Sequence, residues 1–517
     1  MREEPNATTP RLFVVYASED RPFVEGFLLQ ALALPEGSVL ESTKLAIGAP
    51  IVREIARGAV SPVQDYMAFF QSPGFLYLSG YREADATLLM TKKGSDVRWS
   101  LFVQGRSPAQ EVWSGRRNGP AGAAKLTGMH TQLSSDFDLA LDSALAGAAT
   151  LTVLADLSES GDTLNADDAF VRQMRARHPQ LAVVGANPVL AQLRGTKSAA
   201  ELELIRKAIA ISMDAHREAM RTVKPGMNEF EIQAVVEYTF RRYGADRPAY
   251  ASIVGSGPNA TTLHYNRNDR FVKAGDMIVM DVGAQYQGYA ADLTRSFPVS
   301  GTFTPEQRAI YQVVRDAQAA AERAAKPGAP ARAMSDAASS VIAAGLARLG
   351  LIESPTATYD CSTGDTPRQC PQVQLYYMHG LGHGIGLEVH DPDQYYYTGI
   401  VNPGSAFTIE PGIYVRGNLL DILPKTPRNA QLVAAIGATV RKYADIGVRI
   451  EDDYVVTEEG VEWVSCGLPR EADEIEAMMR GSYRGAPARD AAKVEWYKSD
   501  NARPAPRYQR PNACVKM

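Results

Sequence analysis

The chain has 517 residues, 45% of them hydrophobic and 22% charged, a composition typical of a globular protein that is too long for one core. The formal net charge of −5 argues against a nucleic-acid surface or a polybasic membrane anchor. The longest apolar run, residues 143–155, is shorter than the roughly 20 residues that span a bilayer, so we expect no membrane contact.

The first ten residues lack the apolar core of a signal peptide, which predicts a cytoplasmic protein. A chain whose signal had been removed would begin in the same way, so a periplasmic or secreted protein is the alternative. Cys361 and Cys370 lie close together in a polar insertion, and a bridge there would imply export. We interpret them as two unrelated thiols.

Short β-rich runs alternate with helix-like stretches in the first part of the chain, which predicts an α/β domain over residues 1–193. The histidines of this region, His130 and His178, are not clustered, so we expect no metal site here. The predicted strands cover residues 12–15, 75–78, 87–90, 151–154 and 181–184.

A second domain is predicted over residues 194–480. Ser198 and Glu201 form a capping-box pattern, and apolar residues follow at helical spacing until Lys224-Pro225-Gly226. A second helix is predicted to begin within residues 227–231. A third helix is predicted with Thr304 as its N-cap, Pro305 at the first helical position and Gln307 completing a capping box. It is predicted to end at 326–328.

Strand-like runs lie between and after these helices, which favours an α+β domain. They cover residues 278–282, 293–297, 407–409 and 453–457. Residues 481–517 are rich in Arg, Pro and Ala, and we interpret them as a tail that wraps a surface or stays disordered.

Three of the seven histidines, His379, His383 and His390, lie within thirteen residues and are separated by glycines. Glycine lets the backbone turn sharply and approach other groups closely. The stretch 379–391 therefore predicts an irregular or extended wall of a site. The alternative is a glycine-rich solvated loop that happens to carry histidines. Carboxylates elsewhere in the sequence that could form a site with these histidines would decide against it.

Four acids lie in apolar, strand-like surroundings, where an unpaired carboxylate is costly to bury. A turn centred between residues 286 and 287 would make Asp281 and Asp292 direct cross-strand partners, with Cβ atoms about 4.5 to 5.5 Å apart. Glu410 and Glu451 lie in similar runs. Two carboxylates so close repel each other unless a cation lies between them or one is protonated.

Four carboxylates and one imidazole suit two divalent ions. A histidine ligand favours Mn²⁺, Zn²⁺ or Co²⁺ over Mg²⁺, and such two-metal sites activate water for hydrolysis. Each acid alone would more often be a salt-bridged or surface carboxylate. Together with the histidine stretch they favour a metal centre.

These residues resemble the pita-bread metallopeptidases, and within them the Xaa-Pro aminopeptidase (aminopeptidase P) and prolidase branch, over about residues 65–479. The resemblance implies an α/β N-terminal domain, an α+β pita-bread catalytic domain and two metal ions, with Mn²⁺ preferred. It implies the five metal ligands Asp281, Asp292, His383, Glu410 and Glu451.

The same resemblance implies roles for residues around the ligands. His264, His379 and His390 are similar to the family's substrate-binding and proton-handling histidines, and Glu410 is expected to carry a proton as well. Tyr414 and Arg449 match positions that support the ligands and the bound substrate.

The N-terminal half also carries the resemblance. Residues 75–86 and 111–119 are similar to segments of the aminopeptidase P N-terminal domain, which implies a homodimer or homotetramer. The polar insertion 361–370, the long segment 415–446 and the tail depart from shorter relatives.

The implied reaction is hydrolysis of the bond between an N-terminal residue and a following proline, on a proline-containing peptide. A strict Xaa-Pro dipeptidase (prolidase) is the first alternative, and methionine aminopeptidase, which usually lacks a large N-terminal domain, is the second. A metal-free binding module or a non-peptidase relative is the third, and the presence of all five ligand positions opposes it.

Overall fold

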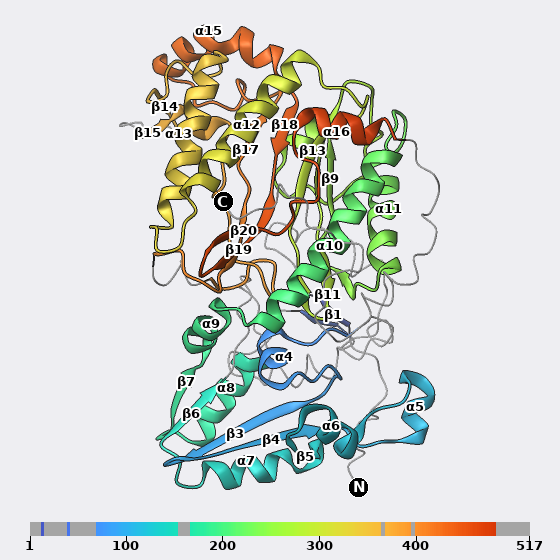
Figure 1. The fold of residues 1–517 in the computed structure, drawn as a ribbon. Helices are drawn as coiled ribbons and strands as arrows, with labels where there is room; N and C mark the ends of the chain where they lie inside the picture. The colour runs from blue at the N-terminus through green and yellow to red at the C-terminus, as the bar shows by residue number, and fades with distance from the viewer. Residues whose placement is uncertain are drawn as a thin grey trace. The chain divides into compact units, whose positions relative to one another are not determined.

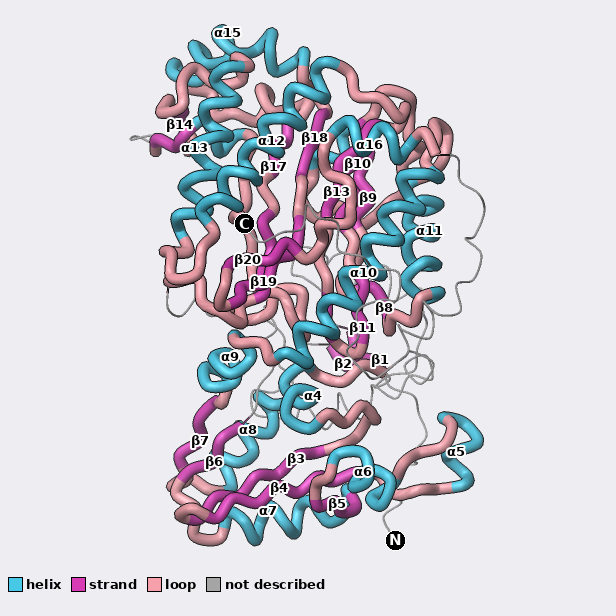
Figure 2. The backbone as a smooth tube through the Cα atoms, in the orientation of Figure 1, coloured by secondary structure: helices cyan, strands magenta, loops and turns pink. Residues whose placement is uncertain are grey.

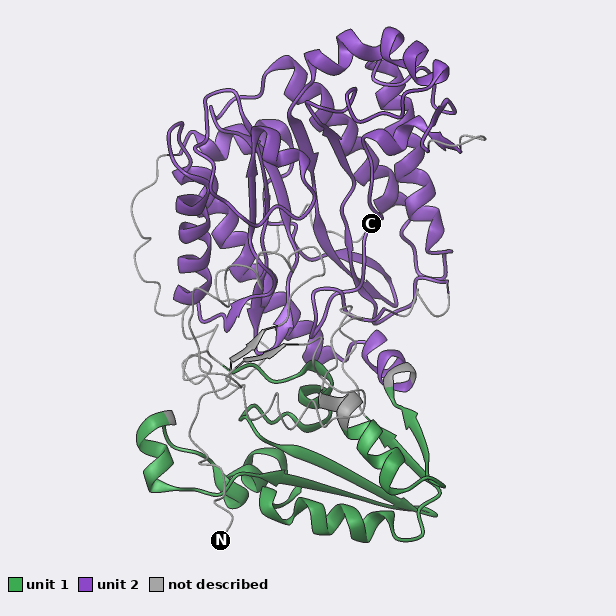
Figure 3. Ribbon diagram, turned by 180° about the vertical axis from the view of Figure 1, so that it is seen from behind, with its two compact units in different colours: residues 1–187 green, residues 188–517 purple. Residues whose placement is uncertain are grey.

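A computed structural model of the chain describes residues 69–153, 166–362, 368–393 and 399–481, together with the strands β1 (Leu12–Val14) and β2 (Val39–Glu41). The chain divides into two compact units, Met1–Asn187 and Pro188–Met517 (Figure 3). The division into domains at 193/194 and 480/481 stays a prediction, and the tail from residue 482 lies outside the described residues. Within the described part, no helix has the length and apolarity to cross a membrane.

The N-terminal unit contains the three-stranded sheet β3-β4-β5 and the pair β6-β7 (Figures 1 and 2). β4 pairs with β5, and β6 with β7, in parallel. Tyr81, Leu101, Val103 and Ala123 form its buried cluster. Its elements are α4 (Pro73–Ser79), β3 (Thr87–Lys93), β4 (Asp96–Val103), α5 (Pro108–Ser114), α6 (Gly119–Thr127), β5 (His130–Leu133), α7 (Phe137–Leu145), β6 (Thr150–Val153), α8 (Ala166–Arg177) and β7 (Ala182–Gly185).

The predicted strand at residues 75–78 is wrong, because this run lies in the helix α4. Pro73 stands at the start of that helix, and Gly80 follows it with φ +64° in the left-handed region, as is common after a helix C-terminus. A short apolar run does not distinguish a strand from a helix. Here the flanking Pro73 and Gly80 favour the helix.

The helices of the second unit follow their capping signals. α10 (Ala199–Thr222) begins after Ser198 and α12 (Pro305–Ala324) after Thr304, each with both hydrogen bonds of the predicted capping box. In Figures 1 and 3 the pairs α10–α11 and α12–α13 lie to either side of the central strands. The other helices are α9 (Asn187–Gly195), which spans the division between the units, α11 (Glu229–Arg242), α13 (Arg332–Arg348), α15 (Pro427–Lys442) and α16 (Ala472–Met479).

The strands of the second unit pair antiparallel in small sheets (Figure 2), as an α+β domain requires. The sheet β13-β10-β9 and the sheet β16-β19-β20 are joined by a bridge between Thr294 and Glu451. The strands are β8 (Arg247–Pro248), β9 (Ile253–Ser256), β10 (Met277–Asp281), β11 (Ala284–Tyr286), β12 (Tyr289–Ala290), β13 (Thr294–Pro298), β14 (Thr358–Asp360), β15 (Gln369–Pro371), β16 (Ala406–Ile409), β17 (Gly412–Val415), β18 (Ile446–Arg449), β19 (Asp452–Thr457) and β20 (Gly460–Trp463).

The predicted pairing of Asp281 with Asp292 is wrong by two residues. Asp281 lies opposite Thr294, and the turn falls at Gln287 and Gly288, with φ +51° and +87°. Glycine adopts such angles without penalty, and this places the turn one position later than predicted. A shift of two keeps every side chain on its face, so the two aspartates still point to the same side.

The interpretation of Cys361 and Cys370 as unrelated thiols is also wrong. The two residues form a disulfide, with Cα atoms 5.7 Å apart. The polar insertion folds as the antiparallel pair β14–β15, in which Cys370 lies opposite Tyr359, the residue two positions before Cys361. This pairing brings the sulfur atoms together.

Candidate metal centre

Two of the predicted ligands, Asp281 and Asp292, meet at one tyrosine. The Tyr250 hydroxyl lies 2.5 Å from Oδ1 of Asp281 and 2.5 Å from Oδ1 of Asp292. A hydroxyl has one hydrogen, so it can donate to only one carboxylate at a time. Both aspartates are buried, 7% and 5% exposed. Their closeness therefore calls for a proton or a cation between them.

The glycine-rich stretch 379–391 is irregular, as predicted, and runs beside β16. Thr408 N–H donates to the His383 carbonyl at 2.9 Å, and Glu410 N–H donates to the Leu381 carbonyl at 2.8 Å. A Cβ at Gly382 would collide with the Thr408 carbonyl oxygen, so only glycine permits this approach. The pairing places His383 next to Glu410.

His383 presents one ring nitrogen to the acids. Its Nδ1 lies 3.1 Å from the Gly384 carbonyl, which can only accept, so Nδ1 carries a hydrogen. Nε2 faces Oδ2 of Asp292 at 3.4 Å and Oε1 of Glu410 at 3.6 Å. A backbone acceptor on the other ring nitrogen is the usual way to orient a metal-binding imidazole.

Glu451 completes the set from the junction of β18 and β19. Its backbone bridges to Thr294, and its Oε2 accepts a 2.6 Å hydrogen bond from the Thr294 hydroxyl. Its Oε1 is buried, and no described residue offers that oxygen a hydrogen bond. A buried carboxylate oxygen without a donor is a costly arrangement, and a cation would relieve it.

The chemistry of this cluster fits divalent cations. Ligand atoms of Asp292, His383 and Glu451 all lie within 4.8 Å of one another. Asp281 joins them through Tyr250, and Glu410 joins them beside His383. The structure therefore brings together all five residues predicted as ligands, and Oε1 of Glu451 has no hydrogen-bond donor among the described residues.

Burial and the closeness of the acids also shift the pKa values of these residues in the metal-free protein. Burial, followed by the charges of neighbouring acids, raises the pKa of Asp292 and raises that of Glu451 well above its usual value. Burial raises the pKa of Glu410 to about 7. Burial lowers the pKa of His383, but its hydrogen bond to Asp292 and the charges of Asp292 and Glu410 outweigh this and raise it to about 9. In the metal-free protein these shifts favour the protonated forms of Asp292, Glu410, Glu451 and His383.

Arg449 and Tyr414 lie beside the acids. Arg449 Nη2 forms an ion pair with Oδ2 of Asp281, and Nη1 donates to the Tyr414 hydroxyl at 2.9 Å. The same hydroxyl lies 2.8 Å from Nε2 of His379. The chain Asp281–Arg449–Tyr414–His379 is largely buried, so it fixes one predicted ligand and one predicted substrate-facing histidine together.

The remaining predicted histidines lie at the exposed side of the cluster. His390 is exposed, and its ring centroid lies 4.2 Å from that of His383. His264 is exposed, and the carbonyl of the preceding Leu263 accepts from both terminal nitrogens of Arg449 at 3.3 Å. Their exposure leaves both rings accessible to a substrate.

Three residues of the cluster were missed from the sequence. Tyr250 contacts both aspartates, but a single tyrosine before a strand gives no signal. Asp453 accepts from the Asp292 backbone N–H at 3.1 Å. Thr294 could have been found, because it follows Asp292 by two residues and a strand repeats its face every second residue.

The metal-free protein is expected to lose stability between pH 6.5 and 9. The pKa of His383 is about 9 in the fold and 6.5 ordinarily, so its contribution is fully present below pH 6.5 and is lost as the pH rises through 9, about 3 kcal/mol in all. Glu410, raised from 4.5 to about 7, acts in the same direction. His379, lowered by burial to about 4, loses its contribution only as the pH falls below 6.5.

Thermal unfolding in the presence of a chelator measures this effect. The midpoint should fall from pH 6.5 to 9 without metal and should stay nearly constant with saturating Mn²⁺, since bound cations replace the protons. A midpoint that rises over this interval without metal would show that the cluster does not hold protons.

Comparisons with known proteins identify two families that the chain matches. Residues 203–458 match Metallopeptidase family M24, and residues 59–154 match the Aminopeptidase P, N-terminal domain. The chain is 31% identical over 459 residues to the Xaa-Pro aminopeptidase of Escherichia coli (strain K12), covering 86% of this chain and 96% of that protein. It is 35% identical over 317 residues to the Xaa-Pro dipeptidase of Homo sapiens, covering 57% of this chain and 62% of that protein.

A solved structure has the same fold. Zinc-substituted E. coli aminopeptidase P in complex with product is 30% identical, with a TM-score of 0.67, and the match covers 81% of this chain and 91% of that chain.

Proposed function

The chain belongs to metallopeptidase family M24, and from that membership we propose that it releases the first residue of peptides whose second residue is proline. It is a metallo-aminopeptidase with an aminopeptidase P N-terminal domain and a pita-bread catalytic domain. One observation carries the choice of reaction. The match to an Xaa-Pro aminopeptidase covers 86% of this chain, whereas the match to an Xaa-Pro dipeptidase covers 57%.

Five residues are proposed to hold two divalent ions: Asp281, Asp292, His383, Glu410 and Glu451. The four acids would supply carboxylate oxygens to the ions, and His383 would supply Nε2, the ring nitrogen that faces Asp292 and Glu410. The oxygen-rich set with one imidazole favours Mn²⁺, and the zinc-substituted relative makes Zn²⁺ the first competitor. When bound, such ions lower the pKa of water and polarise a carbonyl group.

The protein's own groups are proposed to position the peptide and to move its protons. Oε2 of Glu410 lies 3.8 Å from Nδ1 of His379, and a carboxylate beside a histidine at the edge of the site can take up and give up a proton as a general base and acid. Glu410 would deliver that proton to the proline nitrogen, which must be protonated to leave.

The three outer histidines are proposed to recognise the substrate. Proline has no N–H and a fixed φ. An enzyme that cleaves the bond before proline therefore needs a pocket that fits the pyrrolidine ring. Because His264 and His390 are exposed and His379 is fixed by Tyr414, they can line the bound peptide. One of the exposed rings would donate a hydrogen bond to the developing oxyanion.

Peptide length distinguishes the two closest reactions. The enzyme is expected to cleave both an Xaa-Pro dipeptide and an Xaa-Pro-Pro tripeptide, with the tripeptide giving the higher kcat/KM, because a dipeptidase caps its site against longer chains. Chromatography of the released amino acid measures both rates. Activity confined to the dipeptide would replace this proposal with prolidase activity.

The assembly and the compartment are also proposals. A homodimer or homotetramer is proposed from the family. The cytoplasmic location stays a prediction, but the Cys361–Cys370 bridge supports the exported alternative, since disulfides persist in oxidising compartments. Sedimentation of the purified protein and fractionation of the source cells test these two points separately.

A further inference from the structure

Glu229, the first residue of α11, carries a carboxylate in a side chain that is 0% exposed. Burying a carboxylate is costly unless donors surround it, and four residues supply them here. Oε1 accepts from the backbone N–H and the hydroxyl of Ser256, both at 2.7 Å. Oε2 accepts from the Arg270 N–H at 2.9 Å and from the Tyr265 hydroxyl at 3.0 Å. The side-chain amide of Asn259 donates to both oxygens, at 3.2 and 3.3 Å.

All of these donors belong to one segment, residues 256–270, which we call the His264 loop. It leaves the end of β9, forms a 3₁₀ helix at Gly257–Thr261 and returns to α11, where the Arg270 carbonyl accepts from the Glu229 N–H at 3.0 Å. His264, which is exposed, lies between these two ends. Glu229 therefore ties both ends of the loop to the start of α11, and it ties the middle through Tyr265.

The Tyr265 hydroxyl has two acids within reach. It lies 3.0 Å from Oε2 of Glu229 and 3.0 Å from Oδ1 of Asp269, and it has one hydrogen to donate. Asp269 is exposed, so water can supply its hydrogen bonds, whereas a missing hydrogen bond at the buried Glu229 would cost free energy. The hydroxyl therefore donates to Glu229.

We propose that Glu229 and Tyr265 are positioning residues that hold His264 beside the metal centre, where the substrate binds. The residues on either side of His264 are both anchored. The Leu263 carbonyl accepts from both terminal nitrogens of Arg449 at 3.3 Å, and Tyr265 donates to Glu229. An exposed ring on a loop keeps one place only if its backbone is fixed by such supporting contacts. This inference rests on the proposed peptidase function, which assigns His264 to the substrate.

A double-mutant cycle with His264 tests the positioning role. Tyr265→Phe removes one hydroxyl and should lower kcat/KM for an Xaa-Pro-Pro peptide about 10-fold, because a displaced group loses much of its effect on the reaction. In protein that already carries His264→Ala, Tyr265→Phe should lower kcat/KM by less than about two-fold more. Equal losses in the two backgrounds would overturn the proposal, because Tyr265 would then act independently of His264.

Hydrogen exchange of the Mn²⁺-loaded protein, followed by mass spectrometry, tests the anchoring without relying on activity. Tyr265→Phe and Glu229→Gln should each speed exchange several-fold within residues 257–270 and leave the stretch 379–391 unchanged. Unchanged exchange in the His264 loop would overturn the proposal even if the protein cleaves Xaa-Pro peptides. Faster exchange in a protein without that activity would support the anchoring and refute the proposed function.

Two variants of α11 are matched controls. Glu231 is an exposed acid in the same helical turn as Glu229, and in Glu231→Gln the glutamine can keep the capping hydrogen bond to the Asn228 N–H. Tyr238→Phe removes the hydroxyl of an exposed tyrosine. Both variants should match the unmodified protein in kcat/KM and in exchange of the His264 loop.

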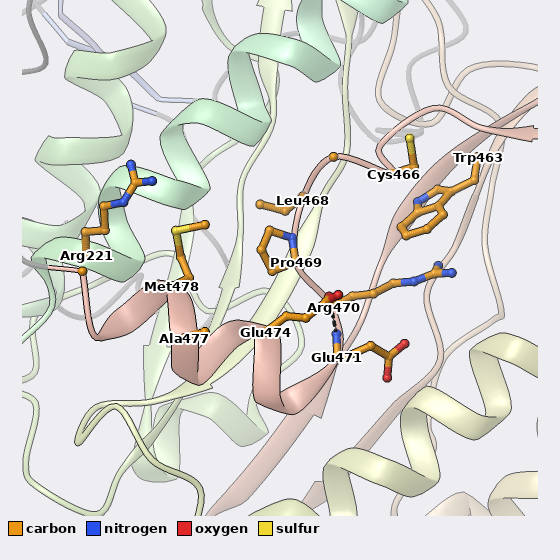
Figure 4. A pocket seen from close by; sticks show the side chains of 12 residues that line it. Arg221, Trp463, Cys466, Leu468, Pro469, Arg470, Glu471, Glu474, Ala477 and Met478 are labelled. Carbon is orange, nitrogen blue, oxygen red and sulfur yellow. Dashed lines mark hydrogen bonds between the residues drawn. The ribbon is translucent and has the colours of Figure 1, made fainter. Parts of the chain in front are cut away.

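A cavity of about 770 Å³ in the second unit provides a third control (Figure 4). It lies between residues 463–470 and α16 and shares no lining residue with the metal centre or the His264 loop. Arg221 and Arg470 line it beside Glu471 and Glu474, so its charges are balanced and favour no charged ligand. Glu474→Gln, at an exposed position of its wall, should leave kcat/KM and loop exchange unchanged. A change equal to that in Tyr265→Phe would show that the effect is not specific to the loop and would overturn the proposal.

Discussion

Asp292→Asn is expected to lower kcat/KM for an Xaa-Pro-Pro peptide on the order of 10³-fold or more. Asp292 is one of the five residues proposed to hold the two ions. Its Oδ1 contacts Tyr250 and its Oδ2 faces His383, so it is the acid that links the two sides of the cluster. An amide of the same shape has no negative charge, and the site should lose metal together with activity.

The matched control is Asp421→Asn, which removes the charge of an exposed aspartate outside the cluster. It should leave both activity and metal content unchanged. Metal analysis of the same preparations separates loss of the ions from misfolding, which circular dichroism would reveal. Full activity in Asp292→Asn would contradict the assignment of Asp292 as a metal ligand.

Arg449→Met is expected to destabilise the protein by about 3 kcal/mol or more, because it removes one partner of a buried ion pair and leaves the other charge unpaired. Arg449 is 3% exposed and pairs with Asp281. It also donates to Tyr414, which in turn contacts His379. The substitution should therefore weaken metal binding and raise KM as well.

Urea unfolding with and without Mn²⁺ measures the effect on stability. Arg449→Lys should recover part of it, since the charge remains but the forked geometry is lost. Arg348→Met, at an exposed position near the end of α13, is the control and should change stability by less than about 0.5 kcal/mol. An Arg449→Met protein as stable as the control would show that Asp281 is neutralised by other groups.

The parts of the fold that the sequence predicted are those with local signals. Ser198 with Glu201, and Thr304 with Gln307, formed both capping boxes, because these side chains satisfy backbone N–H groups a few positions away. The strand prediction at 75–78 failed because a four-residue apolar run has no decisive period. The hairpin register failed because it depended on the single residue at which the turn begins.

The clustering of the four acids with the histidine stretch could be predicted, because acids in apolar strands and glycine-spaced histidines are unusual on physical grounds. The choice of His383 among the histidines rested on the family resemblance. The error in register left the predicted clustering intact, because a shift by an even number of residues keeps each side chain on the same face of the strand. Tyr250 and Asp453 could not be predicted, because each reaches the cluster through folding of distant segments. The Cys361–Cys370 bridge likewise depended on the pairing of β14 with β15.

Metal titration of the peptidase activity tests the central claim most directly. Chelated, metal-free protein should release no amino acid from an Xaa-Pro-Pro peptide, and activity should return with Mn²⁺ and reach a plateau at two equivalents per chain, confirmed by metal analysis. Full activity in the metal-free protein, or none in protein that holds two ions, would contradict a dinuclear Xaa-Pro aminopeptidase.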